Sequence, residues 1–360
     1  MHIWLVVTNL HQGGAERTTL NLSIWLKERG HDVRLILLER MVDYDLPSSL
    51  SLHFLEARKK GATKGWLGKQ LLTWRLRRWA QRESADREPD LVISTLPFTD
   101  EIVHRAGLKN VWYRIPNPLT PQISALEILE PRKAQRRLAR FRKLYGGANL
   151  ITISEGIIGD LNALGIQPLK AVTIYNPFDF DEIKRRAALP EPDLPAEPYV
   201  IHAARFVPQK RHDVVLDAFA AAALPHRLVL MTRRSRKLEA MIDARGLADR
   251  VIVTGFRRNP FPWYARAAAL IHGSDFEGFG NVLVEALACG TPVVSTDCPT
   301  GPREILTGDL NRFLSPPGDA QALARNLVAC IEAPPKIDEG VLERFSKDRA
   351  LSSLESLSKR

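Results

Sequence analysis

The chain has 360 residues, of which 45% are hydrophobic and 26% are charged, and its formal net charge is +10. This length predicts about two domains, and the composition is ordinary for a soluble globular protein. The three cysteines, Cys289, Cys298 and Cys330, form no paired or ligand-spaced set, which argues against a disulfide framework and fits a reducing compartment.

The positive charge is concentrated in the first half of the chain. Residues 58–82 hold nine Lys and Arg residues without an acid, and residues 131–143 hold seven, so the remainder of the chain is net negative. Such a field attracts phosphates of nucleic acid, anionic lipid or a phosphorylated acceptor. The N-terminal apolar run is too short for a signal peptide, and no stretch approaches about 18 apolar residues, so we expect a cytoplasmic protein.

The first half alternates predicted strands and helices. A buried strand over residues 2–8 is followed by a glycine turn, a helix over 15–29 and an apolar strand over 33–38, which is the order of a parallel βαβ unit. Further short apolar runs continue the series at 91–94, 111–115, 150–153 and 171–174.

A second series follows a proline-rich region. Its predicted strands cover 199–204, 227–231, 250–254, 269–272 and 292–296. Two such series predict an α/β protein with two Rossmann-like, doubly wound domains. The expected divisions are an N-terminal domain over 1–176, a linker region over 177–198, a C-terminal domain over 199–340, and a helix over 341–360 that packs back on the first domain.

The most informative stretch of the second half follows the strand that ends near His272. Glu277 lies in a Gly-rich turn and Glu285 lies inside the next helix, at the sheet edge where doubly wound folds bind ligands. Carboxylates there can accept hydrogen bonds from sugar hydroxyls, and Gly278 and Gly280 let a ligand approach the backbone. Spacing alone leaves two solvated glutamates as an equally good interpretation.

Neighbouring sequence blocks favour a ligand-binding site over two solvated glutamates. Glu-x7-Glu stands here with Glu-Gly-Phe-Gly, Ala-Cys-Gly-Thr-Pro-Val-Val and Gly-Pro-Arg-Glu-Ile-Leu, and together they resemble the retaining glycosyltransferase family 4, which has the GT-B fold. The resemblance implies a nucleotide diphosphate sugar as co-substrate, with UDP as the expected carrier and GDP as the alternative. It also implies that Glu285 binds the donor ribose, that Glu277 contacts the donor sugar, and that Phe279 and Asn281 help to hold the donor.

Two further segments of the second half fit a donor site. Arg205 and Lys210 lie on the loop after the first strand of the second series, where two cations can clamp a diphosphate and stabilise the charge that grows as the sugar leaves. A solvated basic loop is the alternative. Gly255 and Phe256, with Asn259 nearby, resemble the family segment whose backbone holds the nucleotide base.

The acceptor is expected to bind the first domain. The Gly13-Gly14-Ala-Glu-Arg block resembles a motif of bacterial enzymes that build surface polysaccharides or lipid-linked oligosaccharides, although an ordinary tight turn would look the same. Where many relatives carry a histidine, this chain has Arg114, a poor proton acceptor that suits acceptor phosphate. We expect no metal cofactor, since the sequence shows neither Asp-x-Asp nor a His/Cys cluster.

The basic stretches suggest a membrane partner. A Trp-rich basic helix over 63–82 is of the type that lies on anionic membranes, but its apolar residues spread over more than one face, so a helix packed on the sheet remains open. Within 131–145 a stripe predicts a core-facing side, formed by Ala134, Leu138, Phe141 and Tyr145.

The expected acceptor is a glycan, carried on polyprenyl diphosphate at the inner face of the plasma membrane. Two other functions stay open at this point, a nucleotide-sugar epimerase of the same fold and a nucleic-acid-binding protein. No recognised nucleic-acid module supports the second, so we expect no nucleic-acid partner.

Overall fold

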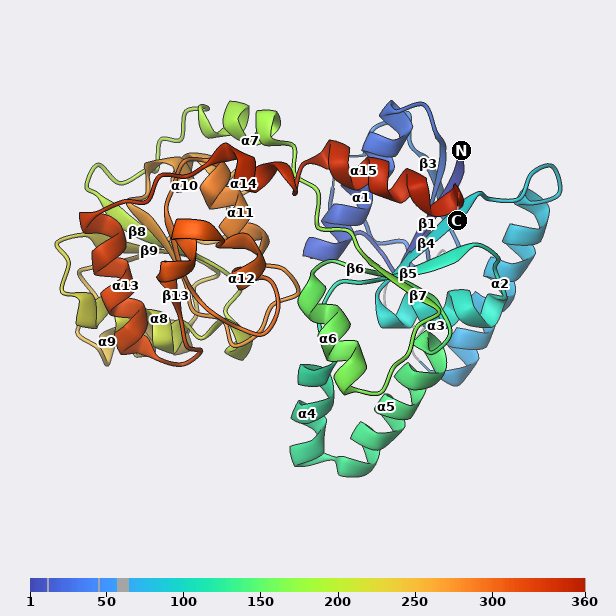
Figure 1. The fold of residues 1–360 in the computed structure, drawn as a ribbon, viewed down its shortest axis with the longest axis horizontal. Helices are drawn as coiled ribbons and strands as arrows, with labels where there is room; N and C mark the ends of the chain where they lie inside the picture. Colours follow the sequence, from blue (N-terminus) through green and yellow to red (C-terminus); the bar gives the residue numbers. More distant parts are fainter. Residues whose placement is uncertain (12, 45, 57–64, 360) are drawn as a thin grey trace. The chain divides into compact units, whose positions relative to one another are not determined.

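The computed structural model describes residues 1–11, 13–44, 46–56 and 65–359, and the chain forms two compact units (Figure 1). The first unit comprises Met1–Pro177 and Lys347–Arg360, and the second comprises Phe178–Ser346. Residues 57–64, which carry part of the basic stretch predicted over 58–82, lie outside the described ranges.

The first unit is built on a seven-stranded sheet in the order β3-β2-β1-β4-β5-β6-β7, in which every pairing is parallel. This order places β1, β4 and β5 side by side at the centre of the sheet. The elements are β1 His2–Val7, α1 Gly14–Glu28, β2 Asp32–Leu37, β3 Ser51–Phe54, α2 Trp66–Glu83, β4 Leu91–Thr95, α3 Pro97–Ala106, β5 Val111–Ile115, α4 Thr120–Leu129, α5 Pro131–Tyr145, β6 Asn149–Thr152, α6 Glu155–Ala163 and β7 Lys170–Thr173.

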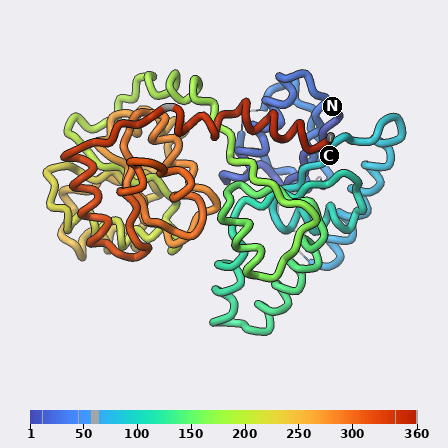
Figure 2. Tube along the Cα trace, in the orientation of Figure 1, coloured from blue at the N-terminus to red at the C-terminus, as the bar shows by residue number. Residues whose placement is uncertain are grey.

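The end of the chain belongs to the first unit. Helix α15 (Lys347–Ser356) and the short 3-10 helix Leu357–Lys359 lie beside α1, as the red and blue segments of Figure 2 show. Leu351 and Leu354 are buried in the same core as strands β1 and β2. Arg29 pairs with Asp348 at 2.7 Å, and His31 contacts Glu355 at 2.8 Å. Apolar burial and charge pairing therefore both hold this helix on the sheet.

The second unit has a six-stranded parallel sheet in the order β10-β9-β8-β11-β12-β13. Strands β8 and β11 are neighbours, so the loops that follow them meet at one edge. The elements are α7 Phe180–Ala187, β8 Tyr199–Ala203, a 3-10 turn Pro208–Lys210, α8 His212–Ala222, β9 Arg227–Met231, α9 Arg236–Asp243, β10 Val251–Val253, α10 Phe261–Arg266, β11 Ala269–His272, α11 Asn281–Ala288, β12 Val293–Thr296, α12 Pro302–Ile305, a 3-10 helix Gly308–Phe313, β13 Leu314–Ser315, α13 Ala320–Glu332 and α14 Glu339–Glu343.

The stretch treated above as a linker region carries ordered structure. From Phe178 onward it belongs to the second unit and includes helix α7, which is capped by the side chain of Asp179. Ile183 is buried, and Asn259 donates to the carbonyl oxygen of Arg186 at 2.9 Å. The prolines at both ends of this stretch therefore mark its boundaries, while a short amphipathic helix between them packs on the unit.

The predicted doubly wound architecture is confirmed in both units. Strands β3 and β13 were not predicted. β3 is half-buried at all four positions and β13 has two residues, so neither produces a continuous apolar run. The stripe predicted on α5 is confirmed for Ala134, Phe141 and Tyr145, which are buried, while Leu138 is half-buried.

Candidate functional site

The centre of the candidate site is the buried carboxylate of Glu277, in the loop between β11 and α11. Lys210 donates to its Oε1 at 2.5 Å, and Nε2 of His272 lies 2.9 Å from the same oxygen. The three side chains come from two loops and one strand end, and they meet because β8 and β11 are adjacent. The structure thus brings Lys210 and Glu277 together across 67 positions of sequence.

The charge state of Glu277 follows from these contacts. Burial by itself raises the pKa of the Glu277 carboxyl, but the Lys210 ammonium and the hydrogen bond from His272 outweigh burial and hold the pKa well below its usual range. A carboxylate held in this state can accept hydrogen bonds from sugar hydroxyls, and it cannot serve as a proton donor at neutral pH.

Several further bonds fix the Glu277 loop. Gln209 donates to the carbonyl oxygen of Phe276 at 2.6 Å, and Thr296 donates to that of Ser274 at 2.6 Å. Thr300 donates to the carbonyl oxygen of Glu277. Because side chains of three different segments hold the backbone of this loop, its carboxylate is positioned by the rigid part of the unit.

The other predicted donor residues lie along the same sheet edge. Arg205 is exposed on the loop after β8, and Asn281 and Glu285 are half-buried on α11. Gly278, Phe279 and Gly280 are buried in the loop that precedes α11, where Gly280 has a positive φ of 100°. The structure therefore groups Arg205, Lys210, Glu277 and the start of α11 around two adjacent strand ends.

The segment predicted to hold the base stands apart from that group. Gly255, with φ of 77°, and Phe256 follow β10, which is separated from β8 by β9. The Phe256 side chain is 76% exposed, whereas the Asn259 amide is turned toward α7 and donates to Arg186. The exposed phenyl ring offers a flat apolar surface, whereas the Asn259 amide nitrogen stabilises the packing of α7 through its bond to Arg186.

In the first unit, Gly13, Gly14 and Arg114 lie at the carboxyl ends of central strands. Gly13 precedes α1 in an extended conformation, and the carboxylate of Glu16 lies over it, where a Cβ on Gly13 would come within 2.1 Å. Arg114 is the last residue but one of β5 and is 2% exposed; its Nη2 donates to Oδ1 of Asn176, while Nη1 is buried without a partner. The Arg114 side chain is therefore buried near the carboxyl edge of the sheet and is not exposed to solvent.

Sequence reasoning missed three histidines beneath the donor loops. His272 holds Glu277, and its Nδ1 lies 2.9 Å from the Ser295 hydroxyl. His202 and His212 pack edge to face at 4.7 Å, and both ring nitrogens of His212 are buried without a partner. A histidine at or next to the end of a buried parallel strand, as His272 and His202 are, is the signal that could have revealed these two.

The buried His212 leads to a pH prediction. Burial lowers its pKa from 6.5 to about 4, with Lys210 adding to the effect and Asp213 opposing it. Below pH 6.5 the unfolded chain takes up a proton that the folded chain refuses, so stability present at neutral pH is lost as the pH falls from about 6.5 to about 4. We expect His212 to account for about 3 kcal/mol of this loss.

The measurement is the denaturant unfolding of the second unit between pH 7 and 4, followed by a probe in that unit. His212→Phe removes the titrating ring and keeps an aromatic contact with Phe206, which lies 5.1 Å away. The variant should show a flatter pH profile than the unsubstituted chain. Equal slopes for the two proteins would contradict the assignment.

The described residues show neither a metal cluster nor a spanning helix. No group of three or more His, Cys, Asp or Glu side chains that could hold a metal occurs among them. None of the helices in residues 1–11, 13–44, 46–56 and 65–359 is long and apolar enough to cross a bilayer.

Comparisons with known proteins point to one class of enzyme. The profile of Glycosyltransferase Family 4 matches residues 12–182, and that of Glycosyl transferases group 1 matches residues 197–333. A Campylobacter jejuni protein named N-acetylgalactosamine-N,N'-diacetylbacillosaminyl-diphospho-undecaprenol 4-alpha-N-acetylgalactosaminyltransferase is 28% identical over 85% of this chain and 83% of its own length. The lipopolysaccharide 1,6-galactosyltransferase of Salmonella typhimurium is 30% identical over 54% of this chain and 56% of its own length.

Solved structures share the fold. The crystal structure of Anabaena HepE in complex with UDP-glucose has a TM-score of 0.74 at 20% identity and covers 99% of both chains. The apo form of the lipopolysaccharide outer core galactosyltransferase WaaB has a TM-score of 0.72 at 20% identity, again over 99% of both chains. At such identities the likeness establishes the two-domain GT-B architecture.

Proposed function

The chain belongs to the glycosyltransferases, with a family 4 domain followed by a group 1 domain, and we propose that it transfers a hexose or N-acetylhexosamine from a nucleotide diphosphate sugar to a glycan acceptor. The observation that carries the proposal is the Lys210–Glu277–His272 cluster beside Arg205 at the carboxyl edge of the second sheet. UDP is the proposed carrier, which the UDP-glucose complex of a structure with this fold supports.

The roles follow from charge. Arg205 and Lys210 stabilise the diphosphate as it leaves, because fixed cations gain most from charge that develops in the transition state. Glu277 accepts hydrogen bonds from the donor sugar, and Glu285 on α11 binds the ribose. In this proposal Gly255, Phe256 and Asn259 flank the base, and Gly278, Phe279, Gly280 and Asn281 form the loop and helix start against the donor.

We further propose that transfer retains the anomeric configuration and needs no metal. Glu277 is engaged by Lys210 and His272, so the proposed front-face reaction uses the leaving phosphate as the base for the acceptor hydroxyl. Arg205 and Lys210 supply the positive charge that a metal supplies in other transferases. The word "4-alpha" in the name of the Campylobacter relative agrees with this stereochemistry.

One assay tests the reaction. We expect the purified chain to form an α-glycoside from an α-linked UDP-sugar, identified by the anomeric coupling constant, with a rate that persists in excess EDTA. A β-linked product would overturn retention. Loss of activity in EDTA that Mg²⁺ restores would overturn the metal-free proposal, and an epimerised free nucleotide sugar would favour the epimerase instead.

The proposed acceptor is a glycan on polyprenyl diphosphate, in the assembly of a cell-surface polysaccharide or glycoprotein glycan. The diphospho-undecaprenol acceptor in the name of the Campylobacter relative supports this choice. Gly13, Gly14 and Arg114 are the proposed acceptor or phosphate contacts. Since Arg114 is buried and bound to Asn176, its contact would require the strand end to open.

The first unit carries a surface suited to the membrane on which such an acceptor resides. Lys69 of α2 and Arg140 of α5 both reach Oε2 of Glu101 on α3, at 2.6 and 3.8 Å, so α2 and α5 flank α3. Large apolar side chains are exposed on α2 and at the end of α4, namely Trp66, Leu67, Leu71, Trp74, Ile128 and Leu129. Trp79, by contrast, packs on Trp4 and His53.

Charge completes this surface, which we call the basic face. The outer side of α5 exposes Arg132, Lys133, Arg136 and Lys143. Exposed apolar groups beside clustered cations are the composition that anionic lipid surfaces bind, at about 1 kcal/mol per well-placed cation. We therefore propose peripheral attachment at the inner face of the plasma membrane.

Liposome co-sedimentation tests the basic face. Wild-type protein should sediment with anionic vesicles at low salt and be released at high salt, because screening shortens electrostatic reach to about 10 Å at 0.1 M. The triple change of Arg132, Arg136 and Lys143 to Gln should release it at low salt, whereas the same change at Lys237, Arg325 and Lys336 of the second unit should not. Arg75 and Arg77 make poorer targets, since they bond to Glu56 and to the carbonyl oxygens of α3.

Wild-type protein that stays in the supernatant with anionic vesicles at low salt would exclude the membrane proposal. Equal release by the two triple variants would assign the effect to net charge alone. In either case the donor site would be unaffected, and a soluble acceptor would become the better proposal.

A further inference from the structure

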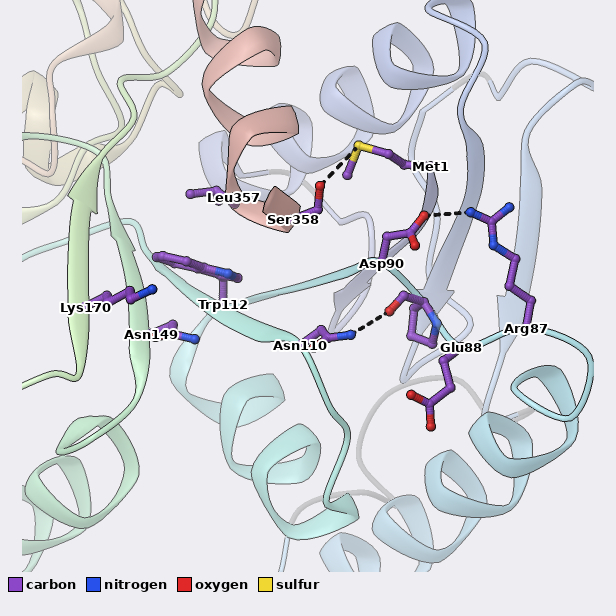
Figure 3. Close-up of a pocket in the computed structure, with 11 residues that line it drawn as sticks. Met1, Arg87, Glu88, Asp90, Asn110, Trp112, Asn149, Lys170, Leu357 and Ser358 are labelled. Carbon is purple, nitrogen blue, oxygen red and sulfur yellow. Dashed lines mark hydrogen bonds and ion pairs between the residues drawn. The ribbon is translucent and has the colours of Figure 1, made fainter. Parts of the chain in front are cut away.

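A pocket of about 600 Å³ lies at the amino edge of the first sheet (Figure 3). The bonds drawn there show that its polar side chains already have partners. Asp90 accepts from Arg87 at 2.8 Å, and the Asn110 amide donates to the carbonyl oxygen of Pro89 at 2.9 Å. These groups therefore stabilise the edge of the sheet, in contrast to the strained segment beside Lys210 in the second unit.

Arg211, the residue after Lys210, has a strained backbone. Its φ of 43° and ψ of 54° lie in the left-handed region, which is unfavourable for a residue that has a Cβ. Arg211 follows the 3-10 turn Pro208–Lys210 and is the N-cap of α8, where its carbonyl oxygen accepts from the backbone N–H of Val215 at 3.1 Å. Its conformation therefore sets the direction in which the chain leaves Lys210 and enters α8.

The Arg211 side chain connects the start of α8 to the Glu277 loop. Its Nη1 donates to Oδ1 of Asp275 at 3.0 Å, while Nε and Nη2 donate to the carboxylate of Asp213 at 3.0 and 2.8 Å. The hydrogen bond from Arg211 is the main cause that holds the pKa of Asp213 below its ordinary value. One guanidinium thus pairs with an acid of α8 and with an acid of the loop that carries Glu277.

Further bonds connect the same two segments on either side of Arg211. The backbone N–H of Asp275 donates to the carbonyl oxygen of Gln209 at 3.0 Å. Lys210 donates to the Glu277 carboxylate at 2.5 Å. Arg211 therefore lies where the structure brings together the proposed diphosphate cation and the proposed sugar-binding carboxylate.

Stability alone does not account for this arrangement. The carboxylates of Asp213 and Asp275 are each 40% exposed, and exposed ion pairs contribute little because water screens them. The left-handed backbone of Arg211 costs about as much free energy as such pairs gain, so the net contribution of Arg211 to folding is small. Strained residues of this kind are typical of functional sites, where the strain accompanies the positioning of other groups.

We propose that Arg211 is a positioning residue for sugar transfer, which holds Lys210 and Glu277 in place for the donor by pairing with both Asp213 and Asp275. This role rests on the proposed function, and Arg211 itself contacts no substrate. With the two segments held together before the donor arrives, binding does not have to order them. Without the pairing, that ordering cost is added to donor binding and to transfer.

The experiment compares Arg211→Gln, which removes the ion pairs and keeps the strain, with Arg211→Gly, which removes both. Arg211→Gly should melt about 2 °C above Arg211→Gln, because Gly adopts this backbone conformation without strain. Both variants should nevertheless bind UDP about 10-fold more weakly than the unsubstituted chain, measured by calorimetry, and should slow transfer by at least the same factor. Asp275→Asn should have a similar effect, and combining it with Arg211→Gln should add little, since both changes remove the same pair.

Ala223→Gly and Arg245→Gln are the matched controls. Ala223, the C-cap of α8, has φ of 49°, so Ala223→Gly relieves strain of the same kind away from the donor loops. Arg245 holds Asp217 through Nε and Nη2 at 2.6 and 3.0 Å, so Arg245→Gln removes a comparable ion pair of the second unit. Both controls should bind UDP and transfer sugar as the unsubstituted chain does.

Four results would overturn the positioning role. These are UDP binding and transfer by the Arg211 variants that match the unsubstituted chain, equal losses in Arg245→Gln, full additivity of Arg211→Gln with Asp275→Asn, or an Arg211→Gly variant that melts below Arg211→Gln. An unsubstituted chain that neither binds UDP nor transfers sugar would instead remove the proposed function, and the role of Arg211 with it. The two failures are therefore distinguishable in the unsubstituted chain.

Discussion

Replacing Arg205 with Ala should slow sugar transfer about 100-fold or more, with little change in stability. The expected loss is that of one fixed charge lost from the transition state in a site with restricted water. Arg205 is exposed on the loop after β8, so its removal leaves no buried partner behind. Steady-state rates at saturating donor, together with a thermal unfolding curve, measure both quantities.

Lys210→Ala should lower transfer by a similar factor, but its effect on folding differs from that of Arg205→Ala. The Lys210 side chain is 17% exposed and pairs at 2.5 Å with Glu277, whose side chain is 8% exposed. Removing one partner of a buried pair leaves an uncompensated charge and typically costs about 3–5 kcal/mol. A loop position by itself predicts little change in folding, whereas the pairing of Lys210 with Glu277 predicts a loss of stability for Lys210→Ala.

A double variant separates the two effects of Lys210. Lys210→Ala combined with Glu277→Gln removes both charges, so part of the lost stability should return while transfer stays slow. Recovery of transfer in the double variant would assign the defect to the unpaired carboxylate. Near-wild-type turnover by Arg205→Ala and by Lys210→Ala would remove the diphosphate clamp from the mechanism.

The parallel sheets could be predicted from sequence because both faces of each are covered. Strand β1 is buried at all six positions, and such strands appear as unbroken apolar runs that need no knowledge of the partner strands. The half-buried strand β3 has no such continuous apolar run, so its sequence does not predict it. The ends of the strands could also be predicted well enough to assign Arg205, Lys210 and Glu277 to loops at one edge of the sheet.

Contacts between those loops could not be predicted in the same way. Whether Lys210 meets Glu277 depends on the adjacency of β8 and β11, which neither loop encodes locally. The role of His272 could not be predicted from sequence either, because a histidine at a strand end is found in a buried core as well as in a binding site. Arg114 shows the reverse case, where a charged residue at a strand end suggested an exposed contact and the structure buries it against Asn176.

Replacing Gly301 of the second unit with Ala adds a single methyl group, and we expect large losses of stability and of transfer. Its backbone has φ of 94° and ψ of −67°, which L side chains rarely adopt. A Cβ there would lie 1.9 Å from the carbonyl oxygen of Phe279 and 2.5 Å from its carbonyl carbon. Both atoms are backbone, so a side-chain rotation cannot relieve the contact.

Relief would have to come from the Glu277–Gly280 loop itself. Phe279 is 2% exposed and packs on Phe345 at 5.1 Å, and Thr300, next to Gly301, donates to the carbonyl oxygen of Glu277. Gly301→Ala should therefore displace the loop that carries the predicted donor contacts. We expect a loss of about 3 kcal/mol or more of stability and about 100-fold or more of transfer, since a shift of about 1 Å at a reacting group costs as much.

Gly308→Ala is the matched control, because Gly308 also has a positive φ, of 59°, while its Cβ would meet nothing within 4 Å. Backbone strain alone then costs about 1–2 kcal/mol and leaves the Glu277 loop in place. Thermal unfolding and transfer rates of the two variants separate strain from collision. If Gly301→Ala were as mild as Gly308→Ala in both measurements, the close approach of Gly301 to Phe279 would not be what positions the donor loop.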